Sequence, residues 1–255
     1  MSEHIEVSVN GGVMEIGINR PDKKNALTAD MYTAMADALD RADADDEVRV
    51  VLFHGTEDCF TSGNDLNDFL ANPPRDQTSG GFRFIHCVGT SATPMVAAVT
   101  GAAIGVGTTM LLHCDFVYAA EDAKFVTPFV NLALVPEAAS SLMLPRIAGL
   151  QRASQMLMLG EPVNAEYAKQ CGFVTEVLPR GDVLDKARET AAKLAAKPPT
   201  ALKWTRALIR GDRSEVESRM SREYEYFGQC LDSDEAKEAL SAFLEKRPPD
   251  YSKLK

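Results

Sequence analysis

Two short glycine-containing segments place backbone N–H groups where a ligand could approach them closely. The first is residues 60–66 (FTSGNDL), and the second is residues 99–107 (VTGAAIGVG), which leads into an apolar helical run. The first N–H groups of a helix lack partners within it and carry the positive end of its dipole, so such a turn can bind an anion. Taken alone, each segment is more typical of a tight turn or a packing device. Neither matches the G-x-G-x-x-G pattern in its usual context, and no Walker lysine follows.

One acid stands in almost wholly apolar sequence. Glu137 lies in residues 134–139 (LVPEAA). Partial desolvation there is expected to raise its pKa toward the range that suits proton transfer at neutral pH. The alternative is a glutamate at a helix start, following a proline at the first helical position, which would stabilise the helix dipole and do nothing more. The local sequence leaves both interpretations open.

The composition excludes several classes of function. The 255 residues include 27 Lys and Arg against 37 Asp and Glu, and the net charge of −10 is unlike the basic surface of a nucleic-acid-binding protein. The five cysteines are scattered without a C-x-x-C pair, and the acids and histidines show no ligand spacing. We therefore expect no metal site, no disulfide framework and no nucleic-acid partner.

No membrane partner is expected either. Residues 84–114 carry no formal charge, but one proline and four glycines interrupt them, whereas a spanning helix needs about 20 mainly apolar residues. The N-terminus lacks the basic and apolar parts of a secretory signal. Lys255 follows a Ser-Lys-Leu sequence that is a peroxisomal address only at the extreme C-terminus. The expected location is the cytoplasm.

Predicted strands and helices alternate before the chain turns helical. Residues 5–18 predict a hairpin with Asn-Gly at its turn, and Thr28 is a predicted N-cap for a helix over 29–42. Further strands are predicted at 49–54, 95–99, 115–119, 124–126 and 173–177, with a loop at 55–63, a short helix at 65–70, a mobile surface loop at 72–81 and a buried helix at 105–113. After a Lys-Pro-Pro sequence, amphipathic helices are predicted at 201–209, 216–227 and 235–244. The pattern predicts an α/β domain over residues 1–197 and a helical region over 198–255.

Together with their neighbours, the two glycine segments resemble those of the crotonase superfamily, the enoyl-CoA hydratase/isomerase proteins. The resemblance runs from residues 19–27 (NRPDKKNAL) to residues 171–177 (CGFVTEV), with several motifs in the same order. It implies a spiral of ββα units, a C-terminal helical region used in trimer assembly, and acyl-CoA thioester substrates.

The resemblance also implies the site residues. In this family two backbone N–H groups hold the oxygen of a thioester enolate, and here they fall on Asn64 and Val106. One such donor is commonly worth a few kcal/mol in the transition state, and a backbone donor survives valine in place of the more usual glycine. Coenzyme A, as part of the substrate, is expected to contact Lys23, Lys24, Ala26 and Ser62. No separate cofactor is implied.

Two positions indicate which reaction of the family to expect. Family hydratases resemble one another in carrying two glutamates, and the matching positions here are Thr109 and Phe129, which cannot accept a proton as a carboxylate does. Both are predicted to line the acyl pocket. Glu137 and its surrounding motifs resemble the Δ3,Δ2-enoyl-CoA isomerase branch, in which a glutamate at this position is the only acid and base. The resemblance therefore implies that Glu137 shifts the double bond of a 3-enoyl-CoA, with weak hydratase activity.

Two alternatives stay open. The chain could be an enoyl-CoA hydratase or another crotonase-type CoA lyase or hydrolase that uses Glu137. It could instead be a non-catalytic acyl-CoA-binding protein. In each case the resemblance implies a homotrimer or a dimer of trimers.

Overall fold

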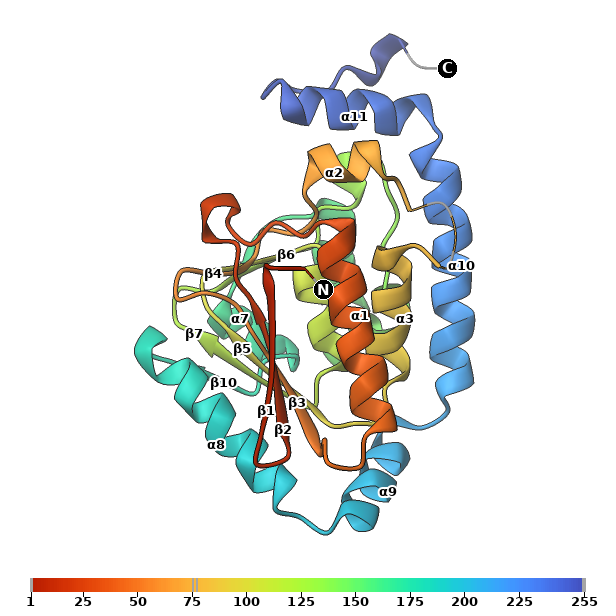
Figure 1. Ribbon diagram of the computed structural model, residues 1–255. Helices are drawn as coiled ribbons and strands as arrows, with labels where there is room; N and C mark the ends of the chain where they lie inside the picture. The colour runs from red at the N-terminus through yellow and green to blue at the C-terminus, as the bar shows by residue number, and fades with distance from the viewer. Residues whose placement is uncertain (1, 75, 77, 254–255) are drawn as a thin grey trace.

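The computed structural model describes residues 2–74, 76 and 78–253 and shows two sheets between which the chain passes repeatedly (Figure 1). The other residues lie outside this description. They include parts of the predicted 72–81 loop and of the C-terminal Ser-Lys-Leu-Lys sequence.

The N-terminal hairpin and the first long helix form where predicted, although the hairpin turn is Gly-Gly rather than Asn-Gly, because Asn10 is the last residue of β1. Strand β1 (Ile5–Asn10) pairs antiparallel with β2 (Val13–Ile18), and the two glycines between them have positive φ angles. The Thr28 hydroxyl accepts a hydrogen bond from the first turn of α1 (Ala29–Ala44) and so caps this helix. The alternating apolar residues of the two strands and the Thr28 cap therefore account for the hairpin and for the start of α1.

From β3 to β8, successive strands alternate between the two sheets, which produces the spiral. The six-stranded sheet has the order β1-β2-β3-β5-β7-β10, and the four-stranded sheet has the order β4-β6-β8-β9, in which β9 is Val163–Asn164. Parallel neighbours in the first are β3 (Val50–His54), β5 (Met95–Val99) and β7 (Phe116–Ala120). The strand that follows each of these joins the second sheet: β4 (Cys59–Thr61), β6 (Ala102–Ile104) and β8 (Lys124–Val126). The α/β spiral of ββα units is therefore confirmed.

Helices follow the strand pairs and cover the six-stranded sheet. Helix α1 packs on β1 to β3 and lies beside α3, while α8 packs across β3, β5 and β7. Residues 50–53 of β3 are fully buried, so both faces of this strand are covered. The helices before the C-terminal region are α2 (Leu66–Ala71), α3 (Gly80–Thr90), α4 (Val106–Thr109), α5 (Ser140–Ala148), α6 (Leu150–Ser154), α7 (Ala165–Cys171) and α8 (Val183–Ala195).

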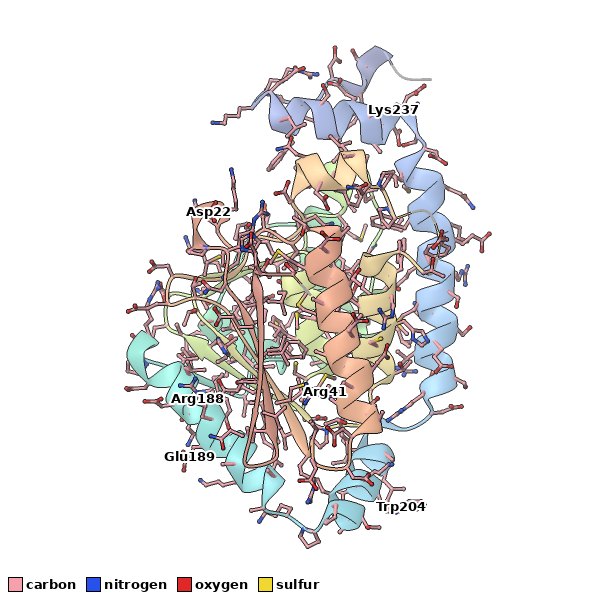
Figure 2. The ribbon with its side chains drawn as sticks, in the orientation of Figure 1. Asp22, Arg41, Arg188, Glu189, Trp204 and Lys237 are labelled. Atoms are coloured by element: carbon pink, nitrogen blue, oxygen red, sulfur yellow. The ribbon has the colours of Figure 1, made fainter. Side chains whose placement is uncertain are left out.

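Three helices form the C-terminal region: α9 (Pro199–Arg210), α10 (Arg213–Leu231) and α11 (Asp234–Leu244). Arg206 and Arg210 of α9 both pair with Asp115, which ties this helix to the core. Helix α10 packs along α3 and α5, and α11 crosses above α2 in Figure 1. Trp204 projects outward from α9 (Figure 2). No helix in the described part of the chain is long and apolar enough to span a membrane.

Several predicted boundaries were wrong. The predicted 55–63 loop contains β4, and β6 was not predicted. A strand of three residues shows little alternation, although β8, which has the same length, was predicted at 124–126. The predicted 173–177 strand is displaced to β10 (Glu176–Leu178). The predicted 105–113 helix continues after α4 as the 3-10 helix η2 (Met110–His113).

Helix α3 was also missed, because it starts with two glycines inside the predicted loop. Packing stabilises it in spite of this low propensity. Phe84 is fully buried against the rings of Tyr32 and Phe53. Arg83 pairs with Asp37 and a neighbouring aspartate on α1.

Candidate functional site

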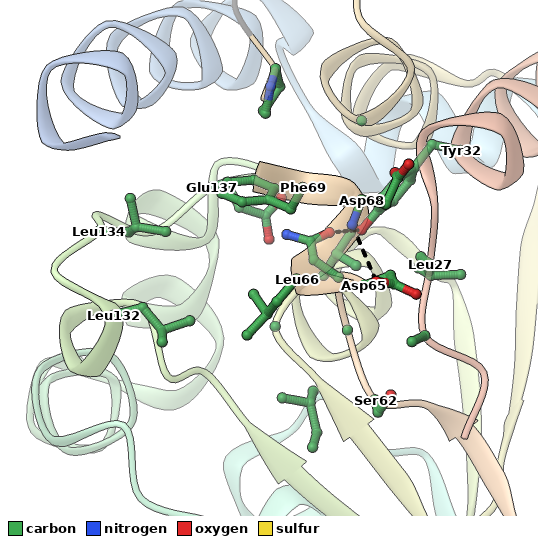
Figure 3. Close-up of a pocket in the computed structure, with 18 of the residues that line it drawn as sticks. Leu27, Tyr32, Ser62, Asp65, Leu66, Asp68, Phe69, Leu132, Leu134 and Glu137 are labelled. Carbon is green, nitrogen blue, oxygen red and sulfur yellow. Dashed lines mark hydrogen bonds between the residues drawn. The ribbon is translucent and has the colours of Figure 1, made fainter. Parts of the chain in front are cut away.

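A cavity of about 850 Å³ opens beside the two glycine turns, and Figure 3 shows part of its wall. Thr109 is fully buried and contacts Glu137 rather than lining the cavity, unlike the acyl-pocket position predicted for it. The structure brings the other predicted site residues together on the wall: Lys23, Lys24, Ala26, Ser62, Asn64, Val106, Phe129 and Glu137.

The backbone N–H of Asn64 is left free by the pairing on either side of it. Leu27 N–H donates to Gly63 O at 2.8 Å, and Asp65 N–H donates to Leu27 O at 2.9 Å. In such a parallel bridge the residue between the two partners turns its own N–H and C=O to the other side. Asn64 lines the cavity, and its N–H has no acceptor among the residues that the structure describes.

The N–H of Val106 is free for a different reason, because it stands in the first turn of α4. Gly105 before it has φ 59° and ψ −119°, a conformation that requires glycine. The Gly105 carbonyl accepts hydrogen bonds from the N–H groups of Thr108 and Thr109, which starts the helix. Within the described chain the Val106 N–H has no acceptor either.

Glycines let the two turns approach each other. A Cβ on Gly63 would lie 3.0 Å from Ile104 O, and a Cβ on Gly107 would lie 2.4 Å from the Thr61 methyl group. Side chains at these positions would push the turns apart. Two free N–H groups on adjoining turns of one cavity wall can hold an anionic oxygen such as that of an enolate.

Glu137 is buried, with 6% of its surface exposed, and its carboxyl faces the cavity (Figure 3). The Thr109 hydroxyl donates a hydrogen bond to Oε1, while Oε2 has no partner among the described residues. Burial raises the pKa of Glu137 to about 8; the Thr109 hydrogen bond opposes this rise and the charge of Glu223 adds to it. A carboxyl with this pKa can both take and return a proton near neutral pH.

Glu137 does not stand at a helix start, so that interpretation of the sequence is wrong. Helix α5 begins at Ser140, and Ala138 and Ala139 have φ angles of 57° and 52°. Residues with a Cβ rarely adopt this left-handed region, and such a turn persists where its surroundings hold it.

Two buried polar side chains hold the turn. His113 Nε2–H donates to Ala138 O at 2.7 Å, and burial lowers the pKa of this imidazole to about 4, so it is neutral at pH 7. Glu223 of α10 accepts hydrogen bonds from Ala139 N–H at 2.6 Å and from Ser141 N–H at 3.0 Å. The C-terminal region thus fixes the backbone that carries Glu137.

Sequence reasoning missed Glu223. Its signal is an acid on the apolar face of an amphipathic helix, since Met220 and Phe227 flank it at helical spacing and all three are buried. An acid on such a face needs partners, and here the backbone of the Glu137 turn supplies them.

In the other two acids of the described cavity wall, both carboxyl oxygens already have hydrogen-bond or ion-pair partners. Asp65 caps α2 and pairs with Arg20 at 2.8 Å. Asp68 accepts hydrogen bonds from Ala29 N–H at 2.7 Å and from an asparagine side chain at 3.0 Å. Glu137 alone among these three acids keeps a carboxyl oxygen without a partner.

Lys23 and Lys24 are exposed beside the cavity, at the end of the short turn η1 (Pro21–Lys23). Buried Asn25 fixes this turn, because its side-chain N–H donates to Cys59 O at 2.7 Å and its Oδ1 accepts from a turn N–H at 2.8 Å. Exposed ammonium groups held beside a cavity suit the binding of phosphate.

Much of the remaining wall is apolar. A hydrophobic cluster on this wall joins Phe69, Phe129, Leu134, Phe227 and Leu240. Such a wall suits an uncharged hydrocarbon chain. Across the described residues, no group of three or more His, Cys, Asp and Glu side chains is arranged to hold a metal ion.

Comparison with known proteins gives the family. Residues 8–254 match the protein family described as enoyl-CoA hydratase/isomerase. The chain belongs to the enoyl-CoA hydratase/isomerase family. It is 32% identical to 1,2-epoxyphenylacetyl-CoA isomerase of Escherichia coli (strain K12) over 99% of both chains. It is 33% identical to enoyl-CoA delta isomerase 2 of Rattus norvegicus over 97% of this chain and 65% of that protein.

The fold agrees with that of a solved structure of the enoyl-CoA hydratase/isomerase family. The crystal structure of enoyl-CoA hydratase/isomerase from Pseudoalteromonas atlantica T6c matches this chain with a TM-score of 0.92 and 42% identity, over 97% of this chain and 99% of that one. The crotonase-type fold predicted from the resemblance is therefore confirmed. The chain is an acyl-CoA enzyme of this family, and the names of its relatives include more than one reaction.

Proposed function

We propose that this chain is an enoyl-CoA isomerase that shifts the double bond of a 3-enoyl-CoA to the 2-trans position. One observation carries the proposal: of the three acids on the described cavity wall, Glu137 alone has a carboxyl oxygen that no other group engages. A 1,3-proton shift needs one carboxylate that acts first as a base and then as an acid.

The steps follow from the geometry of the wall. Ionised Glu137 takes a proton from C2 of the 3-enoyl-CoA and becomes neutral. The electrons move onto the thioester oxygen of the dienolate, which the N–H groups of Asn64 and Val106 hold. Neutral Glu137 then gives its proton to C4, and the conjugated 2-enoyl-CoA forms. The reaction is balanced without added water or a separate cofactor.

Hydration is expected to be slow. It requires a water molecule that is deprotonated as it attacks C3 while another proton reaches C2. Thr109 is occupied by its hydrogen bond to Glu137, and Phe129 belongs to the apolar cluster. Neither side chain can remove the proton of water at neutral pH, so Glu137 would have to act in both roles.

A binding protein without catalysis is the weaker alternative. A buried carboxyl with an unpaired oxygen costs about 1–3 kcal/mol of stability or more. Binding of acyl-CoA does not require this destabilising carboxyl, whereas proton transfer near neutral pH requires a group with a raised pKa such as Glu137. Within the proposal, Lys23 and Lys24 contact the phosphates of coenzyme A, Ala26 and Ser62 contact the rest of that group, and the apolar cluster holds the acyl chain.

The test compares 3-enoyl-CoA and 2-enoyl-CoA of equal chain length. Isomerisation of the first raises the ultraviolet absorbance of the conjugated thioester, and hydration of the second lowers it. We expect a much larger kcat/KM for isomerisation, with a small residual hydration because both N–H donors still act. Hydration as fast as isomerisation would overturn the proposal.

The Glu137→Gln variant tests the acid and base directly. Glutamine keeps the volume of the side chain but cannot carry the transferred proton, so we expect isomerisation to be lost while acyl-CoA binding, measured by calorimetry, is nearly unchanged. Since general acid–base catalysis supplies about 10²–10⁴-fold, a residual rate above about a hundredth of wild type would assign the proton transfer to another group.

A further inference from the structure

A second, smaller cavity of about 270 Å³ lies on the other side of Glu137, between α3 and α10. Phe82, Ile85 and Glu137 line both this cavity and the acyl cavity, so they form the partition between the two. The carboxyl-bearing residue therefore has one cavity for the substrate and a separate one behind it.

The second cavity reaches the protein surface. His86 of α3 and Glu217 and Ser221 of α10 are exposed residues of its wall. Glu137 and Glu223 are buried residues of the same wall. The cavity therefore runs from solvent to the wall that Glu137 helps to form, without passing through the acyl site.

Its size and polarity suit water. Since roughly 15 Å³ of such volume suffices for one water molecule, the cavity has room for several. Side chains of histidine, serine and glutamate on its wall can hydrogen-bond water, and Glu137 Oε2 is buried without a partner in the described chain. The acyl site, by contrast, is lined mainly by apolar side chains beside Glu137.

We propose that the second cavity is a solvent path through which Glu137 exchanges its proton with water while the dienolate is bound. This inference rests on the proposed isomerase function. The neutral carboxyl gives its proton to an adjacent water and receives another proton from that water, so charge and atoms balance. The proton delivered to C4 then comes from solvent rather than from C2 of the substrate.

Isomerisation in D2O tests the path. After a single turnover of unlabelled 3-enoyl-CoA, mass spectrometry and NMR of the 2-enoyl-CoA measure the deuterium at C4. We expect most product molecules to carry deuterium there. Product that keeps the substrate's own proton would overturn the path while leaving the isomerase function intact.

Closing the cavity mouth distinguishes this path from exchange through the acyl cavity. The double variant His86→Phe with Ser221→Phe covers the mouth from both helices, and both residues are exposed, so the fold should tolerate the change. We expect the deuterium content to fall several-fold while the rate of isomerisation is retained. The matched control is Ser218→Phe, at an exposed serine of α10 outside the cavity wall, which should leave the deuterium content unchanged.

The outcomes separate the two proposals. An unchanged deuterium content in the double variant, or an equal fall in the Ser218→Phe control, overturns the path. No rise in absorbance with 3-enoyl-CoA in the wild-type protein overturns the isomerase function, and the path falls with it.

Discussion

Burial and, against it, the hydrogen bond from Thr109 together set the pKa of the Glu137 carboxyl. Burial alone favours the neutral acid, and the Thr109 hydroxyl favours the ionised form, so the pKa of about 8 is a compromise between them. A lower pKa would make the ionised Glu137 carboxylate a weaker base. A higher pKa would leave little of the carboxyl ionised at neutral pH. Thr109 stands at one of the two positions where family hydratases resemble one another in carrying a glutamate. In this chain its hydroxyl instead lowers the pKa of Glu137.

Replacing Thr109 tests this role. Thr109→Val keeps the shape but removes the donor, so the pKa of Glu137 should rise. The ionised form is the base, so the rising limb of kcat/KM against pH should move to higher pH and the rate at pH 7 should fall. Thr109→Ser keeps the hydroxyl and should keep the wild-type profile. Superimposable pH profiles for the valine variant and wild type would contradict the assignment.

Glu137 also makes stability depend on pH. The carboxyl has an ordinary pKa of 4.5 when unfolded and about 8 when folded, so between these values the folded state holds a proton that the unfolded state releases. The free energy of unfolding should therefore fall as pH rises, by about 1.4 kcal/mol per pH unit from this group. Glu137→Gln should remove this slope and be the more stable protein above about pH 8. Denaturant unfolding across the range measures it; parallel curves for the two proteins would show that the carboxyl is not protonated in the fold.

At the scale of residues the sequence predicted the acid but not its supports. Apolar neighbours in the chain indicated that the pKa of Glu137 would be raised. Thr109 and Glu223 are distant in sequence, and no local pattern pairs either of them with Glu137. Their contacts arise from the tertiary fold, in which the spiral brings α4 and the C-terminal region brings α10 against one turn.

At the scale of elements, the closeness of α4 and β4 positions the two N–H donors. The absence of a side chain at Gly107 lets α4 lie against Thr61, whose hydroxyl donates to Asn25 O at 2.6 Å and accepts from Gly63 N–H at 3.1 Å. One threonine therefore fixes the first turn and sets its distance from the second.

Gly107→Ala should separate the donors, because its Cβ would lie 2.4 Å from the Thr61 methyl group. Since misplacement by about 1 Å can cost about 100-fold, we expect kcat to fall roughly 10- to 100-fold with little change in fold by circular dichroism. Thr61→Ser removes the methyl group and keeps the hydroxyl, so it should restore activity to the alanine variant and have little effect alone. A double variant as slow as Gly107→Ala would show that the loss has another origin.

Most elements that the sequence predicted are long enough to show a period, although the three-residue β8 was also predicted and the eleven-residue α3 was not. The hairpin, α1, β3 and β5 have alternating, amphipathic or continuous apolar sequence. The second sheet is built of strands with two or three residues each, and their pairing with distant strands defines them. The two glycine turns of the site were identified in the sequence. Their contact with each other could not be predicted, because it depends on the pairing of β4 with β6 in that sheet.

At the scale of the whole molecule, the C-terminal helices expose unusually apolar surface. Leu208 and Ile209 of α9 are 82% and 78% exposed, next to Trp204. Apolar groups gathered on one helix are typical of a contact surface. The homotrimer or dimer of trimers stays a prediction, and we expect this surface to take part in its contacts.

We therefore expect light scattering to give three or six times the chain mass of 27.7 kDa. Leu208→Glu with Ile209→Glu should shift the protein toward smaller species, because charges replace the apolar contact. Lys203→Glu, at an exposed position on the other face of the same helix, is the matched control and should not. A wild-type monomer near 28 kDa would contradict the assembly.

The anchoring of the Glu137 turn by Glu223 has a consequence for synthesis on the ribosome. The chain is made from its N-terminus, so both N–H donors and the acid emerge first, and the group that holds the turn follows 84 residues after Ala139. A nascent chain that has folded its spiral has the contact of His113 with this turn but still lacks those of Glu223. The polypeptide can acquire its complete reactive geometry only after the ribosome has made α10.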